Sequence, residues 1–438
     1  MEQKEKKYEG AIDAGRSVLD IAADMEKRKG FLRHLEATGK KLHEPEQYAE
    51  TEAYVLSDDC VRDLKRLKAG DYFFAPPFHY RVPKNASGKM RDVYAFKGRD
   101  KYMLRLIAWV MHDFDDELLP DGLYSFRRSV QARDFLFKVR EFKGFGDHYI
   151  VKADVSNYVG SIVPEKIIPQ LEEMWKHDPA LLGLLKFLLL RRECIDRDGN
   201  VVRCEPGGMG GIPVANCFMN VYLTDVDRYF YPRAPLYSRY SDDVVILARN
   251  REEAEAYRAR FLAFLEERQL STNPEKTRLV PPGEPVEILG YKVTGGVIDI
   301  SDHAMMKIKR KLRIRSKRIL RYKKENHLTD AQAAERMISY CNYALFGNGK
   351  KHELSWARWY FPVLTTVDGL REIDRYAQDA IRYVMCGTMR DSRYKIHYDD
   401  LRSLGYRNLV HAYYHFDPAL KETAAEGTPG NPTDAGFD

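Results

Sequence analysis

Apolar and polar positions along this chain change their spacing several times, and each change marks a different predicted element. Residues 1–70 repeat apolar side chains at helical spacing, which predicts a helical N-terminal region. Residues 72–96 are aromatic and extended on either side of the Asn-Ala-Ser-Gly cluster at 85–88, which predicts a hairpin. Residues 101–114 have one aromatic and apolar face, which predicts a helix after that hairpin.

The rest of the chain alternates between the two spacings and then becomes helical. In order, the pattern predicts a β-run at 148–155, a helical stretch at 164–192, a hairpin at 194–204, a helix at 214–229, strands at 236–240 and 244–247, a helix at 252–268, and strands at 286–293 and 297–300. Beyond these strands the chain is nearly all helical up to residue 416. Residues 417–438 contain glycine, proline and few apolar side chains, which predicts a disordered tail.

The composition is that of a globular protein. The 438 residues are 44% hydrophobic and 31% charged, which is enough apolar side chains for large hydrophobic cores. A disordered or fibrous protein is therefore excluded. The longest apolar run, at 181–190, is interrupted by Lys186 and is about half of the roughly 20 residues that cross a bilayer, so a buried helix is expected. The charged N-terminus has no apolar stretch behind it, so we expect no secretory signal and a cytoplasmic protein without a membrane partner.

The six cysteines are scattered along the chain without a Cys-x-x-Cys pair or a nearby pair of histidines. This spacing argues against a structural zinc site. In a reducing compartment it also argues against disulfides. Buried free thiols are the expected state.

Two adjacent acids, in the sequence Tyr240-Ser241-Asp242-Asp243, lie between two apolar β-runs. Such turns occur in ordinary hairpins, but Asp154 also ends a short β-run. If the two runs are neighbouring strands, three carboxylates converge, and they cannot all stay ionised without a cation. Two Mg²⁺ ions would neutralise them and would align a 3′-hydroxyl with a nucleoside triphosphate for in-line nucleotidyl transfer.

The residues around these acids resemble a known family. Ala153-Asp154-Val155-Ser156-Asn157-Tyr158 and Arg239-Tyr240-Ser241-Asp242-Asp243, in this order, resemble the first and third palm motifs of reverse transcriptases. The resemblance implies an α+β right-hand polymerase fold with fingers, an antiparallel-sheet palm and an α-helical thumb. It also implies a catalytic role for the three aspartates, and metal ligation by Asp154, Val155, Asp242 and Asp243 to two Mg²⁺ ions or to Mn²⁺.

Other segments resemble the parts of this family that bind the incoming nucleotide. Lys84 and Arg91 match the fingers hairpin whose cations bind the triphosphate, and Tyr124-Ser125-Phe126-Arg127 resembles a fingers motif of bacterial members. Residues 207–223 resemble the segment that positions template and nucleotide, with Gly210 and Gly211 as candidate contacts. This sequence departs from the family at Gly210, where a glutamine is usual, so any contact of that side chain is lost or supplied elsewhere.

A second departure concerns the residue that faces the sugar. Five residues after the first aspartate, reverse transcriptases usually place a bulky aromatic that blocks the ribose 2′-hydroxyl, whereas this chain has Val159 preceded by Tyr158. One hypothesis is weakened discrimination against ribonucleotides. The alternative is that Tyr158, or a shift of the backbone, closes the same space. Both residues are candidate nucleotide contacts.

Two further resemblances lie C-terminal to the acids. Asn273-Pro274-Glu275-Lys276-Thr277 resembles the motif whose lysine protonates the pyrophosphate leaving group, which makes Lys276 a candidate general acid. Leu289, Gly290 and Tyr291 resemble the primer grip. Together the motifs run from Arg81 to Tyr291, about half of the chain, and their ordered combination is specific even where each is weak.

Charge changes the picture only locally. The whole chain has 71 lysines and arginines and 65 acids. This net charge of +6 is too small to indicate a binding partner. Residues 301–325, in contrast, carry many cations around an apolar stripe and very few acids, so phosphate binding is a better explanation than a solvated helix. The candidates for contact with the nucleic-acid backbone are Lys307, Arg310, Lys311, Arg315 and Arg318. The segment's place after the primer grip matches the thumb of the family.

The predicted domains are an N-terminal helical region at 1–70, fingers at 71–147, palm at 148–295, a basic helical thumb at 296–416 and the tail at 417–438. The chain resembles most the stand-alone bacterial reverse transcriptases that act in antiphage defence with a neighbouring noncoding RNA. The expected partners are therefore an RNA template, a DNA product and deoxynucleoside triphosphates. Three alternatives stay open: a retron-type enzyme that makes RNA-linked DNA, an RNA-dependent RNA polymerase, and an RNA-binding scaffold with a relict polymerase core.

Overall fold

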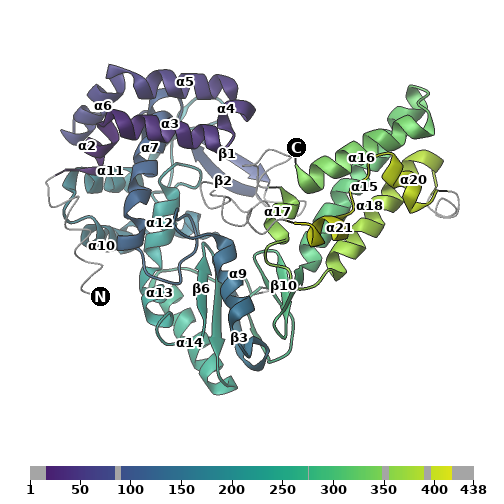
Figure 1. Ribbon diagram of the computed structural model, residues 1–438. Coiled ribbons are helices and arrows are strands. Elements are labelled where there is room, and N and C mark those ends of the chain that lie inside the picture. Colours follow the sequence, from purple (N-terminus) through teal and green to yellow (C-terminus); the bar gives the residue numbers. More distant parts are fainter. Residues whose placement is uncertain (1–15, 84–89, 275, 348–354, 389–395, 417–438) are drawn as a thin grey trace. The chain divides into compact units, whose positions relative to one another are not determined.

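A computed structural model of the protein describes residues 16–83, 90–274, 276–347, 355–388 and 396–416 (Figure 1). The chain forms two compact units. The first comprises residues 1–131 and 148–281, and the second comprises residues 132–147 and 282–438. Helices are combined with short, mainly antiparallel sheets, so the fold class is α+β, as expected for a right-hand polymerase. The predicted boundaries of fingers, palm and thumb stay predictions.

The first unit begins with a group of helices, which confirms the predicted helical region over the part of it that is described. They are α2 (Val18–Ala23), α3 (Met25–Ala37), α4 (Lys40–His43), α5 (Pro45–Leu56), α6 (Asp58–Lys68) and, after the first hairpin, α7 (Gly98–Met111). Ser17 caps α2 in a capping box with Asp20. Its hydroxyl also donates to Asp178 over 2.7 Å, a buried link across 161 residues of sequence.

A four-stranded sheet follows, with the order β2-β1-β4-β5. Its strands are β1 (Phe78–Pro83), β2 (Met90–Ala95), β4 (Glu193–Ile195) and β5 (Val201–Arg203). The two predicted hairpins are confirmed as antiparallel pairs. They are joined by a short parallel contact, Phe78 opposite Ile195, which no local pattern could have indicated.

A second four-stranded sheet, with the order β6-β7-β3-β8, carries the acids. Its strands are β3 (Tyr149–Asp154), β6 (Tyr237–Tyr240), β7 (Asp243–Ala248) and β8 (Arg278–Val280). The central strands β3 and β7 are rich in buried apolar side chains, and α14 (Arg251–Glu267) packs against both. The strands at 236–240 and 244–247 are confirmed to within a residue, whereas the short strand β8 was not predicted.

Two long helical stretches of the first unit are each divided. Residues 164–192 form α10 (Pro164–Met174) and α11 (Pro179–Leu190), because Asp178 caps the second helix and Pro179 occupies its first turn. Residues 214–229 form α12 (Ala215–Tyr222) and α13 (Thr224–Phe230). The remaining short helices of this unit are α8 (Asp115–Leu118) and the 3₁₀ turns η1 (His112–Phe114) and η3 (Val159–Ser161).

The second unit combines a small sheet with a helical bundle. Its elements are α9 (Ala132–Glu141), η2 (Phe145–Asp147), β9 (Val286–Ile288), β10 (Tyr291–Thr294), β11 (Val297–Ile300), α15 (Asp302–Glu325), α16 (Asp330–Phe346), α17 (Trp356–Tyr360), α18 (Asp368–Cys386), α20 (Tyr398–Ser403) and α21 (Leu409–Tyr414). The strand predicted at 286–293 is two strands, because Leu289 and Gly290 turn the chain with positive φ angles of 51° and 84°. The bundle core includes Leu312, Met337 and Ile381.

Two expectations from composition can be followed in the structure. Among the described residues, no helix is both long and apolar enough to cross a bilayer. The cysteines all carry free thiols; Cys60, Cys194, Cys204 and Cys341 are buried as predicted, whereas Cys217 is partly exposed and Cys386 is exposed. Residues 417–438, predicted to be a disordered tail, lie outside the described residues.

Candidate active site

The acids meet at one edge of the second sheet. Strands β3 and β7 pair antiparallel with Asp154 directly opposite Asp243, and the Val155 N–H donates to the Asp242 carbonyl over 2.9 Å. A two-residue turn, Ser241-Asp242, joins β6 to β7, and Ser241 has a φ of 56° in the left-handed region. A non-glycine residue adopts this conformation only when its surroundings hold it there. The fold therefore brings together Asp154, Asp242 and Asp243.

Lysine side chains supply positive charge to two of the three carboxylates. The Nζ of Lys276 lies 2.9 Å from the Oδ2 of Asp154, and Lys152 forms an ion pair with Asp243. Lys152 precedes Asp154 by two residues in β3 and so shares its face of the sheet. Sequence reasoning missed Lys152, although this two-residue spacing could have indicated it.

Asp242 is the acid that the lysines neutralise least. Burial raises the pKa of Asp242, and the neighbouring charge of Asp154 raises it further, against smaller lowering effects of Lys276 and Lys152. The ionised site thus retains like-charge repulsion that a bound cation would relieve.

The donor set at this edge fits a divalent metal ion of the kind that the motif resemblance implies. Asp154, Asp242 and Asp243 offer the carboxylate oxygens that hard cations prefer, and Val155 offers only its main-chain oxygen. Among the described residues, no three His, Cys, Asp or Glu side chains are already arranged around one point, and Lys276 and Lys152 pair with two of the three carboxylates. When bound, the ions would supply Lewis-acid activation and charge neutralisation.

The first sheet places its hairpin against the glycine-rich segment. The Tyr94 N–H of β2 donates to the Gly210 carbonyl over 2.8 Å, and a Cβ on Gly211 would lie 2.8 Å from the Tyr94 carbonyl oxygen. These glycines therefore permit a close approach of two backbones, as predicted, although here the partner is protein. Arg91 is exposed on β2, and Lys84 lies outside the described residues.

Tyr158 and Val159 point to different surroundings. Tyr158 is buried, and its hydroxyl donates to the Met219 carbonyl over 2.5 Å. Val159 is half-buried beneath the glycines, where a Cβ on Gly210 would lie 2.9 Å from its Cγ1. Tyr158 is thus engaged by the core, which leaves Val159 as the side chain next to Gly210.

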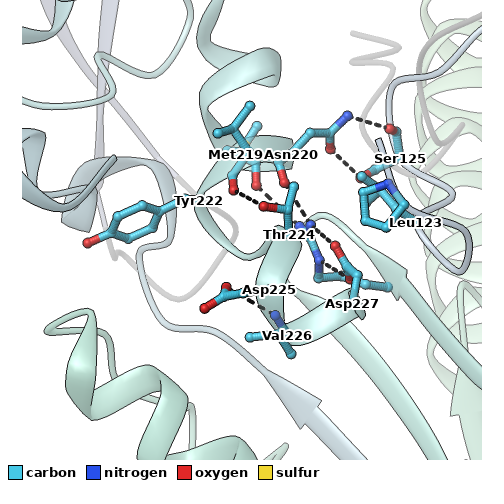
Figure 2. A network of polar contacts seen from close by, with 12 residues as sticks. Leu123, Ser125, Met219, Asn220, Tyr222, Thr224, Asp225, Val226 and Asp227 are labelled. Atoms are coloured by element: carbon cyan, nitrogen blue, oxygen red, sulfur yellow. Dashed lines mark hydrogen bonds and ion pairs between the residues drawn. The ribbon is translucent and has the colours of Figure 1, made fainter. Parts of the chain in front are cut away.

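The largest feature that sequence reasoning missed is a buried ion pair behind the acids. Arg239 and Asp227 have fully buried side chains joined at 2.6 Å, and the Tyr237 hydroxyl donates to the same carboxylate over 2.8 Å. Figure 2 shows Asp227 within this network, together with Met219, Asn220 and Ser125. The only signal in the sequence was a charged residue inside a predicted strand, and this signal could not identify Asp227 on α13 as its partner.

The predicted primer-grip residues lie in the second unit. Tyr291 is buried, its hydroxyl donates to the Trp359 carbonyl, and its ring centroid lies 4.9 Å from that of Tyr360. A Cβ on Gly290 would lie 3.1 Å from the Tyr360 hydroxyl oxygen. Leu289 is also buried, so this turn is fixed on α17 by packing.

The basic helix α15 has one buried and one exposed face. Ile308, Leu312 and Ile319 are buried in its own unit. The predicted phosphate contacts Arg310, Arg315 and Arg318 are exposed, whereas Lys307 and Lys311 are partly buried. The guanidinium of Arg315 lies 5.1 Å from the ring centroid of Tyr340, and Lys309 is paired with Glu372.

Comparison with known proteins gives one family match. Residues 82–293 match the family model described as reverse transcriptase (RNA-dependent DNA polymerase). The matched residues make up just under half of the chain, so the similarity is to a reverse transcriptase domain within it. No curated protein is significantly similar to the chain.

Several solved structures are similar at low sequence identity. The apo telomerase from Candida tropicalis truncated from its C-terminal domain gives a TM-score of 0.42 at 11% identity, over 52% of this chain and 55% of that one. The apo telomerase from Candida tropicalis gives 0.41 at 9%, over 80% and 62%. The telomerase from Candida albicans in complex with a TWJ fragment of telomeric RNA gives 0.40 at 11%, over 80% and 66%. The chain thus spans between 55% and 66% of the length of these structures.

Proposed function

We propose that this chain, in which residues 82–293 form a reverse transcriptase domain, copies a structured noncoding RNA into DNA by Mg²⁺-dependent nucleotidyl transfer and acts in antiphage defence. The observation that carries the polymerase part is the meeting of Asp154, Asp242 and Asp243 at the end of β3 and β7. The noncoding template and the defence role are supported only by the likeness of the motifs to stand-alone bacterial enzymes. A cytoplasmic location likewise stays a prediction.

In this proposal Asp154 and Asp242 hold two Mg²⁺ ions with help from Asp243, and Mn²⁺ is the expected substitute. Lys276 is the candidate general acid for the leaving group, and its Nζ is already placed 2.9 Å from Asp154. Lys84 and Arg91 would bind the triphosphate, and Gly210 and Gly211 would line the nucleotide site next to Val159.

Val159 should make the enzyme tolerant of ribonucleotides. Since the hydroxyl of Tyr158 is held by the Met219 carbonyl, Tyr158 does not supply the missing bulk, and valine leaves more space than an aromatic ring. We expect Val159→Phe to raise the preference for dGTP over GTP by roughly 10- to 200-fold, the range of small steric differences in a pocket. Single-nucleotide incorporation kinetics with both substrates measure this.

Tyr158→Phe is the matched control for that prediction. It removes the hydroxyl that donates to the Met219 carbonyl and adds no bulk next to Gly210. Any fall in rate should therefore affect both nucleotides alike, and the preference for dGTP over GTP should stay unchanged. A wild-type preference for dGTP over GTP of many thousandfold would contradict the hypothesis, because the enzyme with Val159 would then already exclude ribonucleotides.

The exposed arginines of α15 should contribute to nucleic-acid binding only through their attraction to the phosphate groups of the backbone. Each phosphate contact that is lost lowers the slope of log affinity against log salt by about 0.9 on duplex. We therefore expect Arg310→Gln combined with Arg318→Gln to lower the slope by roughly two, measured by fluorescence anisotropy with an RNA–DNA duplex at several salt concentrations. Lys309→Gln is the control, because Lys309 is already paired with Glu372. Equal slopes for the two variants would show that the exposed arginines of α15 do not contact the phosphates of the duplex.

Sequencing of the nucleic acid that copurifies with the protein tests the proposed function. Wild-type protein should carry a defined RNA together with complementary DNA, and the variant with both Asp242→Ala and Asp243→Ala should retain the RNA without the DNA. A scaffold with a relict core would retain its biological activity in this variant, measured as the efficiency of phage plating. DNA covalently joined to the RNA would favour the retron-type alternative, and complementary RNA would indicate an RNA polymerase.

A further inference from the structure

Arg239 is a charged side chain with no exposed surface, three residues before Asp242. Its Nε and Nη2 atoms donate to the two carboxylate oxygens of Asp227 over 2.8 and 2.6 Å. This forked arrangement neutralises the guanidinium and fixes its plane. A buried charge needs such a partner, so the ion pair explains how Arg239 can be buried. It does not explain why an arginine is present at this position.

The remaining donors of Arg239 reach the end of α12. Its Nη2 donates to the Asn220 carbonyl over 2.8 Å, and its Nη1 donates to the Met219 carbonyl over 3.2 Å. Met219 in turn contacts the catalytic turn, because the Ser241 hydroxyl lies 3.7 Å from its Sδ. The same Met219 carbonyl also accepts the hydroxyl of Tyr158. One peptide group thus joins the strand that carries the acids to the segment that carries Val159.

The backbone of Arg239 is fixed from the other side. Its N–H donates to the Gly122 carbonyl over 2.8 Å, and its carbonyl accepts the Tyr124 N–H over 2.9 Å. Ser125 and Asn220 then exchange two hydrogen bonds of 2.8 Å each, drawn in Figure 2. The segment at 122–125 therefore closes a ring of contacts around β6.

We propose that Arg239, held by Asp227, is a positioning residue for nucleotidyl transfer: it fixes the turn that carries Asp242 against Met219, and so sets the distance between the metal-binding acids and the nucleotide side at Val159. This inference rests on the proposed function. A fully connected buried network specifies one geometry, and the strained turn at Ser241 needs such support. Arginine is required because only its fork reaches a carboxylate and two carbonyls together.

Arg239→Lys separates positioning from folding. Lysine keeps the charge for Asp227 but cannot reach both carbonyls of α12. Arg268→Lys is the matched control, because Arg268 is also largely buried, pairs with Asp225 and donates to the Tyr222 carbonyl over 2.8 Å, without contact to the turn. Two measurements are made on each full-length protein: Mn²⁺ affinity by electron paramagnetic resonance, and incorporation of dTTP on poly(rA)/oligo(dT).

We expect Arg239→Lys to weaken Mn²⁺ binding and to lower turnover by about 10- to 100-fold each, the usual cost of losing a residue that orients metal ligands. Its melting temperature, its affinity for the template and all readouts of Arg268→Lys should stay near those of wild type. If Arg239→Lys binds Mn²⁺ and turns over as Arg268→Lys does, Arg239 is structural and the inference is wrong.

If Arg239→Lys fails to fold, the double variant Arg239→Met and Asp227→Leu distinguishes positioning from folding. It removes both charges of the pair, so that neither is buried without its partner. Restored folding with weak Mn²⁺ binding supports positioning, and restored folding with wild-type Mn²⁺ binding overturns it. Failure of the proposed function is distinguishable, since wild-type protein would then incorporate no nucleotide, whereas the Mn²⁺ comparison among the variants is read without turnover.

Discussion

Replacement of Asp242 by asparagine should abolish DNA synthesis. The change keeps the size of the side chain but removes one of the carboxylates that would hold the metal ions beside Asp154. Loss of charge stabilisation in the transition state costs several kcal/mol, and about 4 kcal/mol corresponds to roughly a thousandfold loss of rate. Primer extension on poly(rA)/oligo(dT) at saturating Mg²⁺ measures this loss.

Asp198→Asn is the matched control, since Asp198 is exposed in the turn between β4 and β5 and the substitution changes the net charge equally. We expect its rate to equal that of wild type. The Asp242→Asn protein should remain folded, because burial and Asp154 already raise the pKa of Asp242 and so oppose its charged form. A rate within tenfold of wild type would show that Asp242 does not hold the metal.

Replacement of Asp227 by asparagine should cause the largest loss of stability. Arg239 would remain charged in a fully buried position without its carboxylate. Breaking a buried ion pair from one side costs about 3–5 kcal/mol, a large part of the stability of an ordinary domain. Urea unfolding followed by far-ultraviolet circular dichroism would show this as a lower midpoint with an unchanged slope.

The exposed pair between Arg251 and Glu255 on α14 provides the comparison. Glu255→Gln removes a carboxylate from an arginine in the same way but leaves both groups in water, so the midpoint should not move. Equal midpoints for Asp227→Asn and wild type would mean that Arg239 finds water or another acceptor, and that the network does not depend on the pair.

Much of the site could be predicted because its residues stand at the ends of strands with strong apolar patterns. β3 ends at Asp154 and β7 begins at Asp243, so the turn between β6 and β7 follows from the local sequence. The roles given to Asp154, Asp242, Asp243 and Lys276 remain proposals, but the structure places their side chains at one edge of the sheet.

The parts of the site that could not be predicted from the sequence depend on contacts between distant segments. Lys152 and Arg239 are charged residues within strands, and their partners Asp243 and Asp227 come from other elements. The split at Leu289 and Gly290 requires a positive φ angle, which glycine permits but apolar periodicity does not reveal. Pairing partners and turn geometry of this kind are set by tertiary packing.

The parallel contact of β1 with β4 bears on how the protein is made. The hairpin of β1 and β2 is complete at Ala95, but its outer edge pairs only when Ile195 has been synthesised. At about 5–20 residues per second, the ribosome needs roughly 5–20 seconds for that interval. During this time the free edge of β1 is open to pairing with other chains. Ser17 likewise has no partner until Asp178, 161 residues later, has been synthesised. Slow translation before residue 195 would therefore favour aggregation of nascent chains over correct assembly of this sheet.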